Sequence, residues 1–241
     1  MKITLVIMTL NEIEGMKQIM PLVDPAWCDQ IIVADGGSTD GTIEWSREQG
    51  YEVVVQSKKG IRFAYFDILD HIKGDAIISF SPDGNSPPEA IPLLIEKFKD
   101  GYDLIIASRY LEGAKSEDDD FVTAFGNWLF TKTVNVLHRA KYTDVMVIYR
   151  MYKTSLIYDL DLDEDKSYTL AEKLFSTVIS WEPLMSVRAA KAKMKIGEIP
   201  VDEPARIGGE RKLQIFRWGG AYYFQFWWEL FGWKYHGPKQ R

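Results

Sequence analysis

The chain has 241 residues, 46% of them hydrophobic and 27% charged, which excludes a disordered or fibrous protein and favours one domain with a sizeable core. The formal charge of −6 and the isoelectric point of about 5.2 argue against nucleic-acid binding. One cysteine permits no internal disulfide, and no run reaches the roughly 18 apolar residues of a transmembrane helix, so we expect a cytoplasmic protein.

The first half of the sequence alternates between strand-like and helix-like segments. Apolar, β-branched runs bounded by turn residues predict strands at Ile3–Met8, Gln30–Ala34, Glu52–Gln56, Ala76–Phe80 and Asp103–Ala107. The intervening segments predict helices at Glu12–Leu22, Thr42–Gln49, Gly60–Ile72 and Pro88–Phe98. This order predicts a largely parallel α/β sheet with right-handed crossovers.

The second half has a less regular pattern. It predicts a helix over Phe121–Leu137, a strand over Thr143–Tyr152, a helix over Thr169–Arg188 with a break at Pro183, and a last strand over Met194–Val201. Two acidic clusters, 117–120 and 159–165, are typical of exposed loops or helix starts.

The C-terminal segment is rich in aromatic and basic residues. Ten aromatic side chains fall between Ile215 and Trp233, and residues 186–241 carry 11 Lys/Arg against 5 Asp/Glu. Such a helix suits a membrane surface with anionic headgroups or a homodimer interface, with burial in its own domain as the alternative. We therefore divide the chain into a main domain, 1–213, and a C-terminal segment, 214–241. A membrane contact would place the protein at the inner face of the membrane.

Polar residues follow three of the predicted strands, at 9–12, 35–42 and 81–89. Ligands of parallel sheets bind at the carboxyl ends of the strands, so these residues are candidates for a binding site. Asp35 can accept hydrogen bonds from a base or ribose, Gly36 and Gly37 allow close backbone approach, and Ser38 or Asp40 can cap the next helix. A tight strand-to-helix turn is the alternative. The chain contains neither a Gly-x-Gly-x-x-Gly fingerprint nor a Walker phosphate loop.

Asp83 is the best candidate for a metal ligand, with Asn85 and Ser81 as weaker oxygen donors on the same segment. Magnesium takes only one or two protein carboxylates and completes its shell with water and substrate phosphates, so one aspartate suffices. An ordinary turn before Pro87-Pro88 is the alternative interpretation.

Five motifs together resemble one enzyme family. They are Thr9-Leu-Asn-Glu12, Asp35-Gly-Gly-Ser-Thr-Asp-Gly-Thr42, Asp83-Gly-Asn-Ser-Pro-Pro-Glu89, Ser108-Arg-Tyr110 and Glu198-Ile-Pro200. In this order they resemble the family 2 inverting glycosyltransferases of GT-A fold, in the branch of the dolichol-phosphate (polyprenol-phosphate) mannose synthases. The resemblance runs from Ile3 to about Leu213. It implies a three-layer α/β/α fold with a mostly parallel, mixed sheet, so that 1–213 would be the glycosyltransferase domain.

The resemblance also implies roles for individual residues. Those assigned to the nucleoside-diphosphate sugar are Thr9, Asn11, Glu12, Asp35, Gly36, Ser38, Asp83, Arg206 and Lys212. Asp83 and Asn85 would hold Mg²⁺ or Mn²⁺ against the diphosphate. Asp83, Arg109 and Asp144 are the catalytic candidates, and Asp144 with Arg150 matches an Asp…Arg strand motif that equally suits a supporting salt bridge.

Two departures from the family pattern concern the metal and the acceptor. Ser81 stands where relatives usually carry an aspartate, and the acidic run 117–120 stands where polyprenol-phosphate enzymes tend to have a basic residue. The acceptor is therefore expected to be a polyprenyl phosphate or, alternatively, a sugar or glycan hydroxyl. A nucleotide-sugar-binding protein with weakened catalysis is a third reading.

The expected reaction inverts the configuration at the anomeric carbon. The metal, Arg206 and Lys212 would neutralise the charge of the departing nucleoside diphosphate. A phosphate acceptor is already ionised at neutral pH and needs no base, whereas a hydroxyl does. The candidate bases are Asp118, Asp119, Asp120, Asp144 and Glu182.

Overall fold

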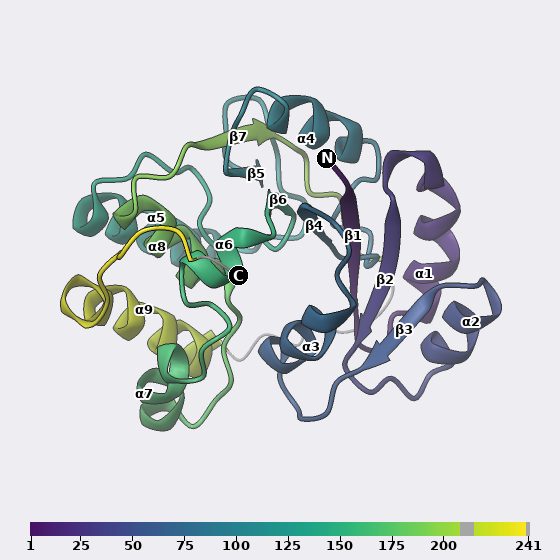
Figure 1. Ribbon diagram of the computed structural model, residues 1–241, viewed down its shortest axis with the longest axis horizontal. Coiled ribbons are helices and arrows are strands. Elements are labelled where there is room, and N and C mark those ends of the chain that lie inside the picture. The colour runs from purple at the N-terminus through teal and green to yellow at the C-terminus, as the bar shows by residue number, and fades with distance from the viewer. Residues whose placement is uncertain (208–214, 240–241) are drawn as a thin grey trace.

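The fold is built on one mixed sheet (Figure 1). The computed structural model describes residues 1–207 and 215–239. In this part of the chain seven strands form the sheet in the order β3-β2-β1-β4-β6-β5-β7. The strands are β1 (Ile3–Thr9), β2 (Gln30–Asp35), β3 (Glu52–Val55), β4 (Ala76–Phe80), β5 (Leu104–Ser108), β6 (Arg150–Lys153) and β7 (Ile196–Pro200). β6 runs antiparallel to both of its neighbours, and the other pairs are parallel.

Helices cover both faces of the sheet, which gives three layers. The helices are α1 (Ile13–Ile19), α2 (Thr42–Glu48), α3 (Ile61–Ile68), α4 (Ala90–Phe98), α5 (Phe121–His138), α6 (Ser155–Asp159), α7 (Lys166–Phe175), α8 (Glu182–Lys191) and α9 (Ile215–Gly232). Alternate strand residues point to opposite faces. Val6 and Ile106 belong to the cluster with α3, α8 and α9, whereas Leu5 and Ile105 belong to the cluster with α1 and α4. The predicted three-layer α/β class is confirmed.

The predicted elements of the first half are all present, with small shifts at their ends. Two of the predicted helices finish as 3-10 turns, at Met20–Leu22 and Leu69–His71. A third 3-10 turn, Pro25–Trp27, was not predicted.

The predicted strand Thr143–Tyr152 is wrong for most of its length, because only β6 is extended there. In the segment before β6, backbone groups form hydrogen bonds with side chains and not with a neighbouring strand. The Asp144 carboxylate accepts from the amides of Met146, at 3.1 Å, and Val147, at 3.3 Å. The Arg150 guanidinium donates to the Val147 carbonyl oxygen. These local bonds replace the ladder that a strand would need.

The predicted helix break at Pro183 is also wrong. Pro183 lies in the first turn of α8, where a missing N–H costs nothing, so it helps to begin the helix. The actual break follows α7, at Ser176, which has a φ of 51°. The acidic clusters do include helix starts, since Asp120 caps α5 through a capping box with Thr123.

The aromatic helix α9 is half buried and half exposed. It packs on α5, α7 and α8, and Ala221, Tyr222 and Phe226 enter the core. On its outer side, Phe216 is 92% exposed and Phe231 is 84% exposed. The predicted domain boundary between 213 and 214 falls outside the described residues and stays a prediction. No described helix has the length and apolar character needed to cross a bilayer.

A buried ion pair attaches α9 to α8. Arg188 Nη2 lies 2.8 Å from Glu229 Oε1, and its Nε lies 3.1 Å from Glu229 Oε2. Both side chains are almost completely buried. Because the charges are desolvated, each depends on the other for compensation.

We expect Glu229→Ala to lower the free energy of unfolding by about 3–5 kcal/mol, because Arg188 keeps its buried charge without its carboxylate. Urea unfolding monitored by circular dichroism measures the change. Glu96→Ala, which removes an exposed glutamate from α4, is the matched control and should change stability by less than about 0.5 kcal/mol. An equal, small effect of both substitutions would show that the ion pair does not hold α9.

Candidate active site

Asp35 organises the turn after β2. It is fully buried, and its Oδ1 accepts from the amides of Gly37, at 2.8 Å, and Ser38, at 2.7 Å. Its Oδ2 accepts from the hydroxyls of Thr9 and Ser38, both at 2.7 Å. A carboxylate has about four acceptor positions, so these bonds use its capacity within the protein. Direct binding of a nucleoside by Asp35 stays a prediction, while its role in shaping the turn is evident from these bonds.

The loops after β1 and β2 are tied together by reciprocal bonds. The Asn11 amide donates to Ser38 Oγ at 2.8 Å, and the Thr39 amide donates to Asn11 Oδ1 at 2.8 Å. The Glu12 amide donates to Thr42 Oγ1 at 3.1 Å. Asn11 has a φ of 54°, a left-handed conformation that asparagine tolerates better than most residues. The two loops therefore form one surface at the carboxyl edge of the sheet.

The turn after β4 brings three predicted site residues into contact. Asp83 is buried, and its Oδ2 lies 2.9 Å from Nη1 of Arg206. The same Nη1 lies 3.8 Å from Oε1 of Glu12. The sequence places Arg206 far from both carboxylates, yet the fold joins it to the first and third of the strand-end motifs. Lys212, the second predicted basic residue, lies outside the described residues.

Asp83 and Asn85 fit a hard divalent cation. The backbone N–H of Asn85 donates to Asp83 Oδ1 at 3.1 Å, which holds the two residues on one turn. Asn85 Nδ2 donates to the Pro204 carbonyl at 2.9 Å, but its Oδ1 is buried without a hydrogen-bond partner. A buried oxygen of this kind is a suitable cation ligand. The described residues contain no group of three or more His, Cys, Asp or Glu side chains for a metal, so solvent or phosphate oxygens would complete the shell.

Arg109 joins the end of β5 to two buried carboxylates. Its Nε and Nη2 lie 2.7 and 3.2 Å from the two oxygens of Asp144, and its Nη1 lies 3.1 Å from Glu203. Burial alone would raise the pKa of the Asp144 carboxyl, but the charge and hydrogen bonds of Arg109 outweigh it and the pKa is lowered. Burial raises the pKa of the Glu203 carboxyl despite Arg109. Asp144 pairs with Arg109 rather than with Arg150, and this geometry suits a supporting ion pair.

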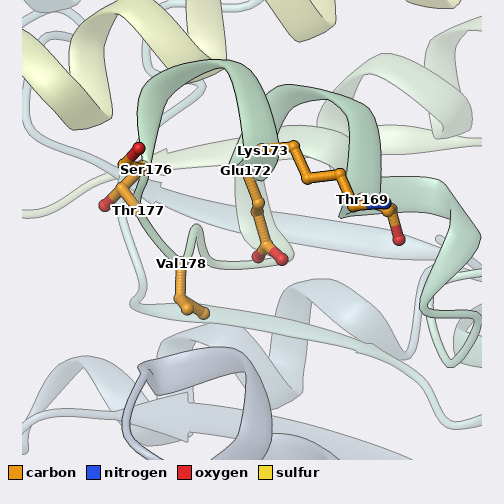
Figure 2. A pocket seen from close by; sticks show the side chains of 6 residues that line it. All are labelled: Thr169, Glu172, Lys173, Ser176, Thr177 and Val178. Atoms are coloured by element: carbon orange, nitrogen blue, oxygen red, sulfur yellow. The ribbon is translucent and has the colours of Figure 1, made fainter.

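A shallow, open pocket of about 370 Å³ lies beside the end of α7 (Figure 2). Its lining residues are Thr169, Glu172, Lys173, Ser176, Thr177 and Val178. Val178 approaches Gly60 so closely that a Cβ there would lie 2.5 Å from Val178 Cγ1. Arg62 of α3 pairs with Glu172 at 2.7 Å, which fixes α7 next to α3. Sequence reasoning did not single out Arg62, although an arginine in an apolar helix stripe is a signal for a buried ion pair.

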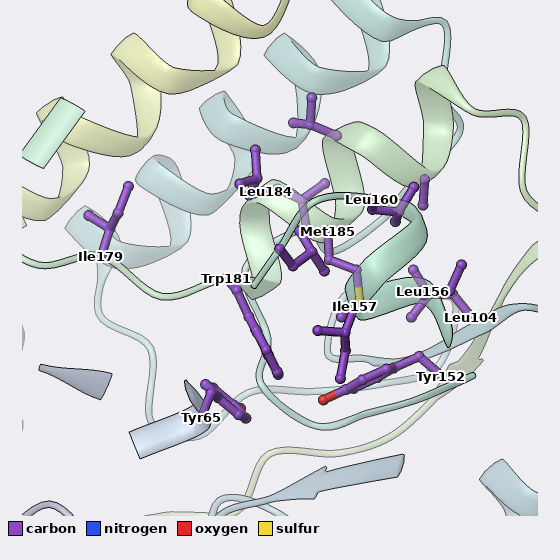
Figure 3. Packing of buried hydrophobic residues seen from close by; sticks show 14 of the residues in the cluster. Tyr65, Leu104, Tyr152, Leu156, Ile157, Leu160, Ile179, Trp181, Leu184 and Met185 are labelled. Carbon is purple, nitrogen blue, oxygen red and sulfur yellow. The ribbon is translucent and has the colours of Figure 1, made fainter. Parts of the chain in front are cut away.

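Glu182 is fully buried and follows Trp181, a residue of the core cluster that Figure 3 shows, so its position argues against a role as general base. Its carboxylate accepts from the hydroxyls of Tyr65 and Ser180, and burial raises the pKa of the carboxyl. Tyr65 in turn stacks on Trp181 with ring centroids 4.2 Å apart. Asp144 is also fully buried and paired.

The other candidate bases lie near the start of α5. Asp119 accepts a hydrogen bond from the Tyr110 hydroxyl, and Asp120 caps the helix. Asp118 is half-buried beside them. All three are engaged in interactions of the protein itself, and none of these contacts distinguishes one of them as a base.

The sequence is similar to those of known proteins. A profile described as glycosyl transferase family 2 matches residues 22–160. The chain is 26% identical to undecaprenyl-phosphate mannosyltransferase of Micrococcus luteus over 236 residues, covering 92% of this chain and 95% of the relative. It is 27% identical to dolichol-phosphate mannosyltransferase of Pyrococcus furiosus over 226 residues, covering 89% of this chain but 60% of the relative. It is 25% identical to glycosyltransferase AglJ of Haloferax volcanii over 222 residues, covering 90% and 68%.

The solved structures show the same fold. Glucosyl-3-phosphoglycerate synthase from Mycobacterium tuberculosis, in complex with Mn²⁺, UDP and glucosyl-3-phosphoglycerate, aligns with a TM-score of 0.68 at 19% identity. The alignment covers 98% of this chain and 82% of that chain. The predicted GT-A fold is thereby confirmed.

We expect Asp35→Asn to lower the free energy of unfolding by about 1–3 kcal/mol, because an amide NH₂ cannot accept from the buried donors around it. Hydrogen exchange at the Gly37 and Ser38 amides should accelerate locally, which mass spectrometry measures. The control is Asp75→Asn at the opposite edge of the sheet, where the side chain accepts from the Lys2 amide in an exposed position. Unchanged exchange at Gly37 and Ser38 would contradict the organising role of Asp35.

Proposed function

Because the chain is a member of glycosyl transferase family 2, we propose that it transfers a sugar from a nucleoside-diphosphate sugar to a polyprenyl phosphate, with inversion at the anomeric carbon. The observation that carries this proposal is the meeting of the β1, β2 and β4 loops with Arg206 at one edge of the sheet. A surface with both carboxylates and a guanidinium suits a ligand that brings phosphates and a cation. The proposed setting is cytoplasmic, at the inner face of a membrane.

Asp83 and Asn85 are the residues that would hold Mg²⁺ or Mn²⁺. Such a cation, when bound, neutralises charge that develops on the departing nucleoside diphosphate. Arg206 is placed to share this task, since its guanidinium can bond phosphate oxygens with two parallel hydrogen bonds. The Mycobacterium tuberculosis synthase complex contains Mn²⁺ and UDP, which supports the same combination for this chain.

A phosphate acceptor agrees with the surroundings of two of the candidate bases, Asp144 and Glu182. Asp144 and Glu182 are buried and hydrogen-bonded, so neither is available to take a proton from a hydroxyl. A phosphate monoester has a second pKa of about 6 and arrives ionised at neutral pH. The relatives from Pyrococcus furiosus and Micrococcus luteus are named for transfer to dolichol phosphate and undecaprenyl phosphate, which favours the same acceptor class here.

The proposal is tested by incubating the protein with Mn²⁺, a panel of labelled nucleotide sugars, and either a polyprenyl phosphate or free saccharides. We expect label in the lipid fraction, and we expect Asp83→Asn to lower kcat/KM by about 100-fold or more, because the diphosphate loses its cation. Asp75→Asn is the matched control.

Label only in the saccharides would favour the alternative, transfer to a hydroxyl. If the protein binds a nucleotide sugar but labels neither acceptor, the result would favour a nucleotide-sugar-binding protein with weakened catalysis. The presence of Ser81, where relatives usually carry an aspartate, motivates this alternative.

The exposed side of α9 is the proposed membrane contact. Phe216, Trp227, Trp228 and Phe231 keep large exposed surfaces, although the opposite side of the helix is docked in the core. Arg217 and Lys234 are exposed at its two ends and suit anionic headgroups. A surface contact of this kind would bring the protein close to a lipid-borne acceptor. A homodimer through the same side is the second candidate.

We expect the protein to float with liposomes that contain anionic lipid, and we expect the double substitution Phe216→Ser/Phe231→Ser to abolish flotation by removing exposed apolar area. Leu22→Ser, at an exposed leucine of the 3-10 turn after α1, is the control and should float like the original. A protein that stays in the aqueous fraction and elutes as a dimer would support the dimer interface instead.

A further inference from the structure

Arg206 forms an ion pair with Asp83, whose carboxylate is the candidate ligand for a cation. Its Nη1 lies 2.9 Å from Asp83 Oδ2 and 3.8 Å from Glu12 Oε1. Both carboxylate side chains are buried, and the arginine side chain is mostly buried as well. The Nε of Arg206 is buried without a hydrogen-bond partner, so the guanidinium uses only part of its donor set. The contact therefore compensates part of the carboxylate charge but leaves a donor that another ligand could use.

The backbone around Arg206 is fastened to the same turn, so the contact is not that of a loose surface side chain. The Ile207 amide donates to the Asp83 carbonyl at 2.7 Å. On the other side, Asn85 Nδ2 donates to the Pro204 carbonyl at 2.9 Å. Gly84 makes this approach possible, because a Cβ there would lie 2.7 Å from Ile207 Cγ1. Arg206 is thus placed on Asp83 by contacts on both sides of it.

A cation on Asp83 would meet this guanidinium at short range. Magnesium binds carboxylate oxygens at about 2.0–2.1 Å, so an ion on Oδ2 would lie no more than roughly 5 Å from Nη1 of Arg206 where it now stands. Two positive charges at that separation in a buried site repel each other strongly. Meanwhile Asn85 Oδ1, the other candidate ligand, stays without a partner. The present arrangement therefore disfavours the ion at Asp83.

We propose that Arg206 is the internal counter-ion of Asp83 and competes with the divalent cation for it. The nucleoside diphosphate relieves the competition, because its phosphates offer Arg206 a bidentate partner and free Asp83 for the metal. Metal alone binds weakly, and metal with nucleotide binds tightly. This inference rests on the proposed function, since it takes a nucleoside diphosphate as the ligand that draws Arg206 away.

The test measures Mn²⁺ binding to the full chain without nucleotide, by electron paramagnetic resonance of the free ion. We expect Arg206→Gln to bind Mn²⁺ more tightly than the original protein by about fivefold or more, the size of a typical coupling between two ligands. Arg206→Met, which keeps the aliphatic stem, should show the same gain. Arg47→Gln, at an exposed arginine in the last turn of α2, is the control and should show none.

A second arm adds a nucleoside diphosphate. It should raise the Mn²⁺ affinity of the original protein and raise that of Arg206→Gln by a smaller factor, because the competition is already gone. Asp83→Asn combined with Arg206→Gln should lose the gain. If both Arg206 variants fold by circular dichroism and bind Mn²⁺ no tighter than the original, the inference is overturned.

The two ideas fail separately. A gain in Mn²⁺ affinity without any sugar transfer by the original protein would retain the counter-ion role and reject the proposed function. Sugar transfer without the gain would do the reverse.

Discussion

The site depends on the parallel pairing of β1 with β2 on one side and β4 on the other. The register sets Thr9 against Asp35 and Ile7 against Phe80, so the three strands end at one edge. Their loops therefore leave the sheet side by side, and short polar side chains are long enough to join them. The bond from Thr9 to Asp35 and the bond from the Asn11 amide to Ser38 follow directly from this register. Without it the same residues would be ordinary turn residues.

The chain after β5 supplies positive charge to this edge. After β7 the chain passes residues 115–117, where the Glu117 amide donates to the Glu203 carbonyl, and then crosses the Asp83 turn. Arg109 and Arg206 each contact two carboxylates along this path. Buried carboxylates would be costly without such partners. The two arginines thus compensate part of the carboxylate charge in the free protein, and a ligand that carries both phosphates and a cation can exchange partners with them.

The sequence predicts the first half well because its signals are local. Alternating apolar runs, turn residues and polar strand ends all lie within a few positions of the elements they define, and Asp35 and Asp83 stand at strand ends as expected. The contact of Arg206 with Asp83 joins segments of the chain that no periodicity connects. The same holds for the ion pair of Arg62 with Glu172, and for the replacement of the expected strand at 143–149 by bonds to the Asp144 side chain. The aromatic composition of α9 likewise favours a contact at the protein surface, but it does not predict which side of the helix is buried in the core.

We propose above all that this edge of the sheet binds a nucleoside-diphosphate sugar with a divalent cation. The most direct measurement is the melting temperature of the protein with GDP, UDP and dTDP sugars, each with and without Mn²⁺. One nucleotide class should raise Tm by about 5–10 °C when it is near 100 times its Kd, and the rise should require Mn²⁺. If no nucleotide sugar changes Tm at any Mn²⁺ concentration, the claim is contradicted.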